Sequence, residues 1–140
     1  IPNKTNKGES DIVVFKINNN GTILWTKQES IFNTENNDVN PCITVDIYGN
    51  SYISYSTNGT IKNNYNAVNS GGYDIVIFKL NTKGNIIWRT QHPSFNTIDN
   101  DLNPSIYIDK KENLYLTYEH KLKNGVSSIV LVKFITTSCF

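Results

Sequence analysis

The sequence lacks several features that would assign it to a class of protein. It has no Met, only two Cys and two His, and no apolar run approaching the ~20 residues of a membrane span. Its 13 Lys and Arg nearly balance 12 Asp and Glu, giving a formal net charge of +1. We therefore expect no nucleic-acid partner and no membrane insertion. Because Met is absent, we also expect a fragment or a processed product.

Catalytic and cofactor motifs are missing as well. Cys42 and Cys139 lie in no CxxC or Cys/His spacing, so a zinc site is not expected, while free thiols and a disulfide both stay open. His92 and His120 have no His at the equivalent position of the other repeat, and no G-x-S-x-G or phosphate-binding loop occurs. The sequence predicts a protein that is not an enzyme and carries no cofactor.

What is present is an internal repeat. Placing Asp11 over Asp74 aligns 11–58 with 74–121 without a gap, and 22 of the 48 aligned positions are identical. A third copy begins with "SIVLVKF" at 128–134, which resembles "DIVIFKL" at 74–80. Such self-similarity is typical of repeat architectures. We predict one repeat region over 1–140, divided into repeat 1 (about 11–73), repeat 2 (about 74–127) and the start of repeat 3 (about 128–140).

One repeat unit reads as four short strands joined by Gly and Asn turns, with no helical period. The strands are expected at 42–46, 51–57, 74–80 and 86–91. Tandem units of this kind predict an all-β fold of four-stranded antiparallel β-propeller blades, about two and a quarter of them, in an incomplete ring. Trp25 and Trp88 occupy the same place on the last strand of a unit and are expected to fill the space between blades.

The repeat resembles the seven-bladed β-propeller (SBBP) family, whose pattern combines an Asp, a Lys, a Gly-containing turn and a Trp with a later D-x-x-G-N-x-Y hairpin. This resemblance covers most of the chain and implies blades, a secreted, cell-surface or virion location, and no shared catalytic set. The second copy has Glu112 where the pattern has Gly, which predicts a different turn there. The matching residues are Asp11, Lys16, Gly21, Trp25, Asp46, Gly49, Asn50 and Tyr52, then Asp74, Lys79, Gly84, Trp88, Asp109, Asn113 and Tyr115.

The segment "NNDVNP" at 36–41 returns as "DNDLNP" at 99–104. We interpret it as one turn built twice, in which Asp38 and Asp101 accept hydrogen bonds from backbone amides. Pro41 and Pro104 are expected at a strand start, where a missing N–H costs least. The alternative is a calcium site with Asp38 and Asp101 as ligands, since oxygen donors suit that ion. The asparagines that would assist them are Asn33, Asn37, Asn96 and Asn100.

Two further sets of residues are candidates. Asp46 and Asp109 precede a hairpin turn and are expected to cap it. The polar loop 58–72 differs in length from its counterpart, and loops that vary on a repeated scaffold often bind ligands. Its binding candidates are Asn58, Asn64 and Tyr65.

From these features we expect a non-catalytic structural or interaction module. Its partners would be other proteins or further blades of the same protein, and a homo-oligomer is one way to complete a ring, because open strand edges invite pairing. Two alternatives remain open: a carbohydrate-binding propeller with a glycan ligand, and a fragment of a propeller enzyme whose site lies outside this chain.

Overall fold

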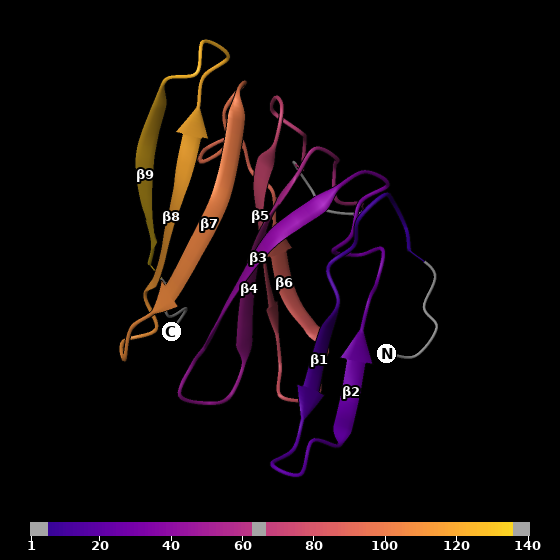
Figure 1. Cartoon of the computed structure of the whole chain (residues 1–140). Helices are drawn as coiled ribbons and strands as arrows, with labels where there is room; N and C mark the ends of the chain where they lie inside the picture. The colour runs from indigo at the N-terminus through magenta and orange to yellow at the C-terminus, as the bar shows by residue number, and fades with distance from the viewer. Residues whose placement is uncertain (1–5, 63–66, 136–140) are drawn as a thin grey trace.

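The chain folds into β-sheets alone in the computed structural model, which describes residues 6–62 and 67–135 (Figure 1). Three antiparallel sheets form: sheet 1 pairs β1 with β2, sheet 2 has the order β3-β4-β5-β6, and sheet 3 has the order β7-β8-β9. The all-β prediction is confirmed. The strands are β1 (Val14–Ile17), β2 (Ile23–Lys27), β3 (Asp38–Val45), β4 (Ser51–Thr57), β5 (Asp74–Leu80), β6 (Ile86–Thr90), β7 (Asn100–Ile108), β8 (Leu114–Lys121) and β9 (Ser127–Phe134).

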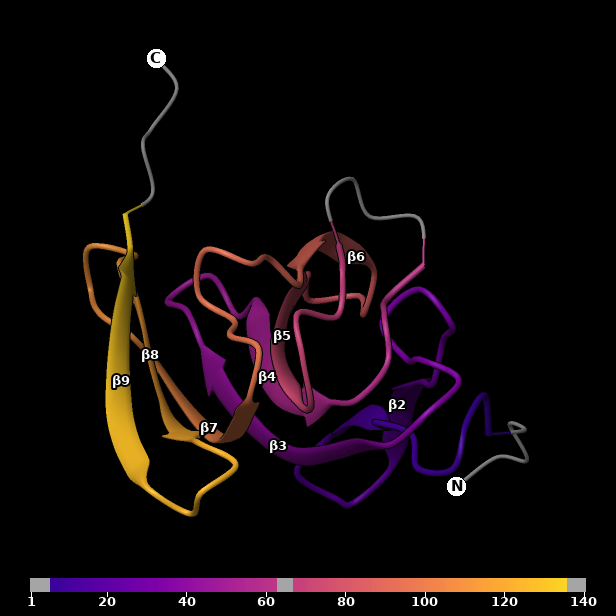
Figure 2. The ribbon, with the colours of Figure 1, turned by 90° about the horizontal axis from the view of Figure 1, so that it is seen from above.

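The three sheets lie side by side in chain order, with sheet 2 in the middle (Figure 2). The first strands of sheets 2 and 3, β3 and β7, are neighbours, and the Asn40 side-chain amide donates to Asn103 Oδ1 at 2.9 Å. These two residues occupy the same position 63 residues apart. Within the described residues the sheets form an open stack and not a closed ring.

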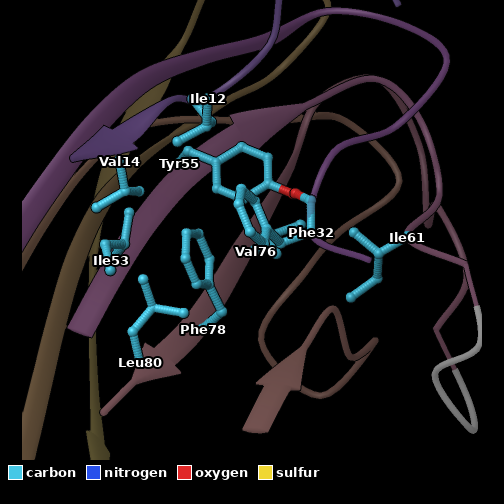
Figure 3. Close-up of a cluster of buried hydrophobic side chains, with 9 residues drawn as sticks. All are labelled: Ile12, Val14, Phe32, Ile53, Tyr55, Ile61, Val76, Phe78 and Leu80. Carbon is cyan, nitrogen blue, oxygen red and sulfur yellow. The ribbon is translucent and has the colours of Figure 1, made fainter. Parts of the chain in front are cut away.

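A first hydrophobic core lies between sheets 1 and 2 (Figure 3). Phe32, which precedes β3, stacks on Phe78 of β5 with 4.5 Å between ring centroids. Tyr55 of β4 meets Phe78 edge-on at 6.2 Å. The buried members of this core are Ile12, Val14, Phe32, Ile53, Tyr55, Ile61, Val76, Phe78 and Leu80.

A second core between sheets 2 and 3 repeats the first one. Phe95 stands where Phe32 does, and Tyr118 stands where Tyr55 does, each 63 residues later. Sheet 2 contributes its opposite face to this core. The buried members are Tyr52, Ile75, Ile77, Phe95, Ile106, Ile108, Leu114, Leu116 and Tyr118.

The apolar pattern of sheet 2 follows from its being covered on both faces. Successive side chains of a strand point to opposite faces, so Val76 enters the first core while Ile77 enters the second. Tyr52 and Tyr55, an odd number of positions apart, divide between the two cores in the same way. This explains why β5 reads as a nearly continuous apolar run.

The structure corrects the interpretation of the repeated N-D-x-N-P segment as a turn before a strand. Asp38 already begins β3, and the pairing register with β4 shifts between Val39 and Cys42. Asn40 has a φ of 54°, a left-handed conformation that Asn tolerates better than most residues. Pro41 therefore lies at a β-bulge inside the strand, where a missing N–H breaks no ladder bond.

The second copy shows the same irregularity. The register of β7 with β8 shifts between Leu102 and Ser105, and Asn103 has the same φ of 54°. Pro104 thus lies inside β7 and not at a strand start. The sequence motif encodes a bulge that is built twice.

The expectation that Glu112 would change its turn is wrong. Glu112 adopts a φ of 63°, close to the left-handed 81° of Gly49. The backbone hydrogen bonds of the two turns also agree, because Gly49 N donates to Asp46 O and Glu112 N donates to Asp109 O, each at 3.0 Å. The second copy keeps the turn and forces a non-glycine residue into it.

The connection that follows the second strand differs between sheets. Sheet 2 uses the long segment 58–73 between β4 and β5, whereas sheet 3 uses the tight turn 122–126 between β8 and β9. In the tight turn, Leu122 N donates to Val126 O at 2.9 Å. Both connections join strands that pair in the same antiparallel manner.

Candidate interaction surfaces

Asp38 and Asp101 hold the loops that lead into β3 and β7. Asp38 Oδ2 accepts from Thr34 N at 2.7 Å, and its Oδ1 accepts from Thr34 Oγ1 at 2.9 Å. Asp101 Oδ2 accepts from Thr97 N at 2.6 Å, in the equivalent loop. Both aspartates are buried. Their carboxylates are engaged by their own loops, which is what the structural interpretation of these residues requires.

Burial also changes the acidity of these two groups. Desolvation raises the pKa of Asp38 and outweighs the hydrogen bonds from Thr57 and Thr34, which act in the opposite direction. Desolvation likewise raises the pKa of Asp101 against the hydrogen bonds from Thr97 and His120. The described residues contain no group of three or more His, Cys, Asp or Glu side chains that could hold a metal ion. The geometry thus gives no support to a calcium site at either aspartate.

A buried polar network that sequence reasoning missed connects the loops before β3 and β7 to earlier parts of the chain, Ile12 just before β1 and Ile75 in β5. Asn33 Oδ1 accepts from Ile12 N at 2.7 Å and Asn33 Nδ2 donates to Ile12 O at 3.0 Å. Asn96 makes the same two bonds to Ile75, at 2.6 and 3.0 Å. The identity of Asn33 and Asn96 across the repeat was the available signal.

Two further pairs complete the network. Gln28 Nε2 donates to Asp11 Oδ2 at 2.9 Å, and Gln91 Nε2 donates to Asp74 Oδ2 at 3.0 Å. The hydroxyl of Tyr55 donates to Phe32 O, and that of Tyr118 donates to Phe95 O. Each of these bonds has its equivalent in the other repeat unit, so the repeat preserves these polar contacts as well as core packing.

Asp46 and Asp109 hold the hairpin turns that follow β3 and β7. Asp46 Oδ1 accepts from Tyr48 N at 3.0 Å and from Asn50 N at 2.8 Å. Asp109 Oδ1 accepts from Lys111 N at 2.8 Å and from Asn113 N at 2.9 Å. Asp46 additionally pairs with Lys79 Nζ at 3.3 Å.

The two tryptophans are partly buried and lie beside different cores. Trp25 packs against the first core, and its Nε1 donates to Thr82 O at 3.2 Å, in the turn between β5 and β6. This bond spans from sheet 1 to sheet 2. Trp88 packs against the second core and meets Tyr52 edge-on, with 6.0 Å between ring centroids.

The candidate binding loop is described only in part. Tyr65 and Asn64 lie outside the described residues, so their predicted role stays a prediction. Asn58 Oδ1 accepts from Asn37 N at 2.9 Å, which engages its side chain within the protein. Cys42 is a free, partly buried thiol, and Cys139 also lies outside the described residues.

An apolar groove is lined by residues of both β1 and β3. One hollow of about 290 Å³ is lined by Trp25, Ile43 and Val45 among others, and a second of about 230 Å³ by Ile12, Pro41 and Ile53 among others. Ile43 and Val45 are 56% and 54% exposed. Their equivalents Ile106 and Ile108 are buried in the second core, because sheet 2 covers them. The groove is therefore a place where a covering element is missing from sheet 1.

Apolar side chains are also exposed at both ends of the stack. We call Phe15, Ile17 and Ile23 of sheet 1 the head face, and Tyr107, Ile129 and Leu131 of sheet 3 the tail face. All six are at least 46% exposed. Clusters of exposed apolar side chains can mark interaction sites.

No protein-family model matches the chain, and no curated protein matches it.

In the described part of the chain, no helix is long and apolar enough to cross a membrane.

Proposed function

We propose that the chain is a non-catalytic structural and interaction module built of β-propeller-type blades resembling the SBBP repeat. In this interpretation sheet 1 supplies the last two strands of one blade, sheet 2 is a whole blade, and sheet 3 supplies the first three strands of another. The module works by shape, because its stacked sheets hold loops in place and leave faces and strand edges to pair with further sheets. Such a role suits a secreted, cell-surface or virion assembly.

One observation carries this proposal: the interface between sheets 1 and 2 recurs between sheets 2 and 3 with equivalent residues. Phe32 and Tyr55 in the first core correspond to Phe95 and Tyr118 in the second. The Asn and Gln bonds at the edges of the cores recur with them. A chain that uses one interface repeatedly is organised to stack sheets, and its buried carboxylates are engaged in holding loops.

The proposal is tested by adding one repeat. A second copy of residues 11–73 is inserted before residue 11, in frame with the natural sequence. The added unit supplies the strands that sheet 1 lacks, so it should cover Ile43 and Val45 and raise the urea midpoint of unfolding. The control insertion is the same segment with Ile12, Val14 and Phe32 changed to Ser in the added copy only.

Limited proteolysis shows whether the inserted copy is folded. The stacking module would be contradicted if the unmodified inserted copy lowered the urea midpoint of unfolding, or if protease digested it as readily as the Ser-substituted control copy. The lectin-like alternative predicts a sugar pocket in every repeat. The two hollows described above are lined by residues of sheets 1 and 2.

A further inference from the structure

The third copy of the repeated strand places two aliphatic side chains on an uncovered surface. Ile129 and Leu131 of β9 occupy the positions of Ile75 and Ile77 of β5. The β5 pair is fully buried, with 0% exposure, in the core between sheets 2 and 3. The β9 pair is 77% and 66% exposed. The tail face is thus one half of an interface that the molecule uses internally.

The other half of that interface is exposed at the opposite end of the chain. Phe15 and Ile17 of β1 occupy the positions of Phe78 and Leu80 of β5, which are fully buried in the first core. Phe15 and Ile17 are 49% and 52% exposed. Ile23, which pairs with Ile17 across sheet 1, is 46% exposed. The head face therefore carries the residue types that cover Ile12 and Val14 inside the molecule.

We propose that the tail face of one copy of this chain binds the head face of a second copy, which makes a third interface of the same kind. This inference rests on the proposed function and adds its partner, a second copy of this chain. Ile129 and Leu131 would meet Phe15 and Ile17 of the neighbour, as Ile12 and Val14 share a core with Phe78 and Leu80 inside one molecule.

Two features favour a second copy as the partner. The chain has both complementary faces, at the N-terminal and C-terminal sheets, so no other molecule is needed to supply either one. Its formal net charge of +1 opposes self-association only weakly. The contact joins different surfaces, so it is heterologous, and successive copies build either a closed ring or an open filament.

The test uses single variants that block one face each. Ile17→Lys blocks the head face and Leu131→Lys blocks the tail face, and both positions are more than half exposed, so folding should be preserved. Ile98→Lys is the matched control, because Ile98 is 75% exposed in the loop before β7 and belongs to neither face. Sedimentation velocity and native mass spectrometry report the assembly of the full chain over a range of concentrations.

The unmodified chain and Ile98→Lys should form species larger than a monomer. Each face variant alone should be a monomer. An equimolar mixture of the two face variants should form a dimer and nothing larger, because one intact head then meets one intact tail. A ring or a filament in the unmodified chain would support the proposal equally.

A monomeric unmodified chain would overturn the inference, and so would a mixture of face variants that stays monomeric. Face variants that assemble as the unmodified chain does would also overturn it. If the inserted repeat stabilises the chain while no assembly occurs, only the second-copy inference fails. If the inserted repeat itself does not fold, the stacking function fails.

Discussion

Glu112 has a backbone conformation that its side chain disfavours. A left-handed conformation costs a non-glycine residue roughly 1–2 kcal/mol, and Glu112 adopts it at a φ of 63°. The turn survives because the Asp109 carboxylate accepts from the amides of Lys111 and Asn113. The resemblance to a pattern with Gly at this position identified Glu112 as unusual. The local residues alone could not show that the turn would keep its geometry with Glu in the left-handed conformation.

We predict that Glu112→Gly stabilises the protein by about 1 kcal/mol, because glycine relieves the strain at a small entropic cost. Glu112→Ala removes the side chain and keeps the strain, so it separates the two effects. Gly49→Ala is the reverse change at the equivalent position and should destabilise by roughly 1–2 kcal/mol. Urea unfolding measures all three. Equal midpoints for Glu112→Gly and Glu112→Ala would show that no strain is stored.

Asn96 satisfies both polar backbone groups of a buried residue. Removing its side chain would leave the N–H and C=O of Ile75 without their partners, at a cost of about 1–3 kcal/mol for each buried group. We predict that Asn96→Ala destabilises by roughly 2–4 kcal/mol, and that Asn33→Ala does so to a similar degree. Thermal and urea unfolding measure the loss. The exposed turn residue Asn85 provides the control, and an Asn96 effect no larger than that of Asn85→Ala would contradict this role.

Strand β3 shows, at the scale of the element, where the sequence was informative and where it was not. The alternation and the apolar runs predicted β4 and β5 at their observed bounds. They placed the start of β3 at Cys42, whereas the strand begins at Asp38. The error arose because Asn and Pro disfavour regular strands, and only the pairing with β4 makes a bulge there. Local residue preferences do not determine which distant strand a segment pairs with.

The hairpin turn after β3 should respond to acid. Desolvation raises the pKa of Asp46, but hydrogen bonds from Asn50, Lys79 and Tyr48 outweigh it and hold the pKa below its usual 3.8. A carboxyl whose pKa is lower in the folded state stabilises that state above the unfolded pKa, and this contribution is lost as the pH falls through the folded pKa. The contribution of Asp46 is therefore fully present at neutral pH and declines below pH 3.8.

We predict that Asp46→Asn is less stable than the unmodified protein at neutral pH and that the difference shrinks as the pH falls below 3.8. Urea unfolding at a series of pH values gives the free-energy difference directly. Asp109→Asn should show the same direction, because hydrogen bonds from Asn113 lower the pKa of Asp109. A difference that is constant across the acidic range would mean that Asp46 contributes through packing alone.

Stability should be distributed unevenly over the whole molecule. Sheet 2 is covered on both faces and β5 lies in its interior, whereas sheet 1 has two strands and one covered face. A two-stranded sheet has little stability of its own. Local opening should therefore begin at the ends of the stack. The internal repeat predicted a series of sheets that pack on one another. Which sheet faces are covered and which are exposed was visible only in the structure.

We predict that backbone amides of β5 exchange with solvent at least about tenfold more slowly than those of β1 and β2, which corresponds to ~1.4 kcal/mol in opening free energy. Hydrogen exchange followed by NMR resolves the two sheets in one experiment. The comparison is made at low protein concentration, so that contacts between molecules do not protect the ends. Equal protection of β1 and β5 would show that the described sheets open as a single unit.

The unequal connections after β4 and β8 have a consequence for engineering. The same two strands pair across the long segment 58–73 in sheet 2 and across the tight turn 122–126 in sheet 3. Strand pairing therefore sets no fixed length for this connection. Replacing the tip of the short turn, at Asn124 and Gly125, with a foreign peptide should leave the cores intact. The repeat thus separates a constant packing layer from a variable loop, which is the property sought in a scaffold for peptide display.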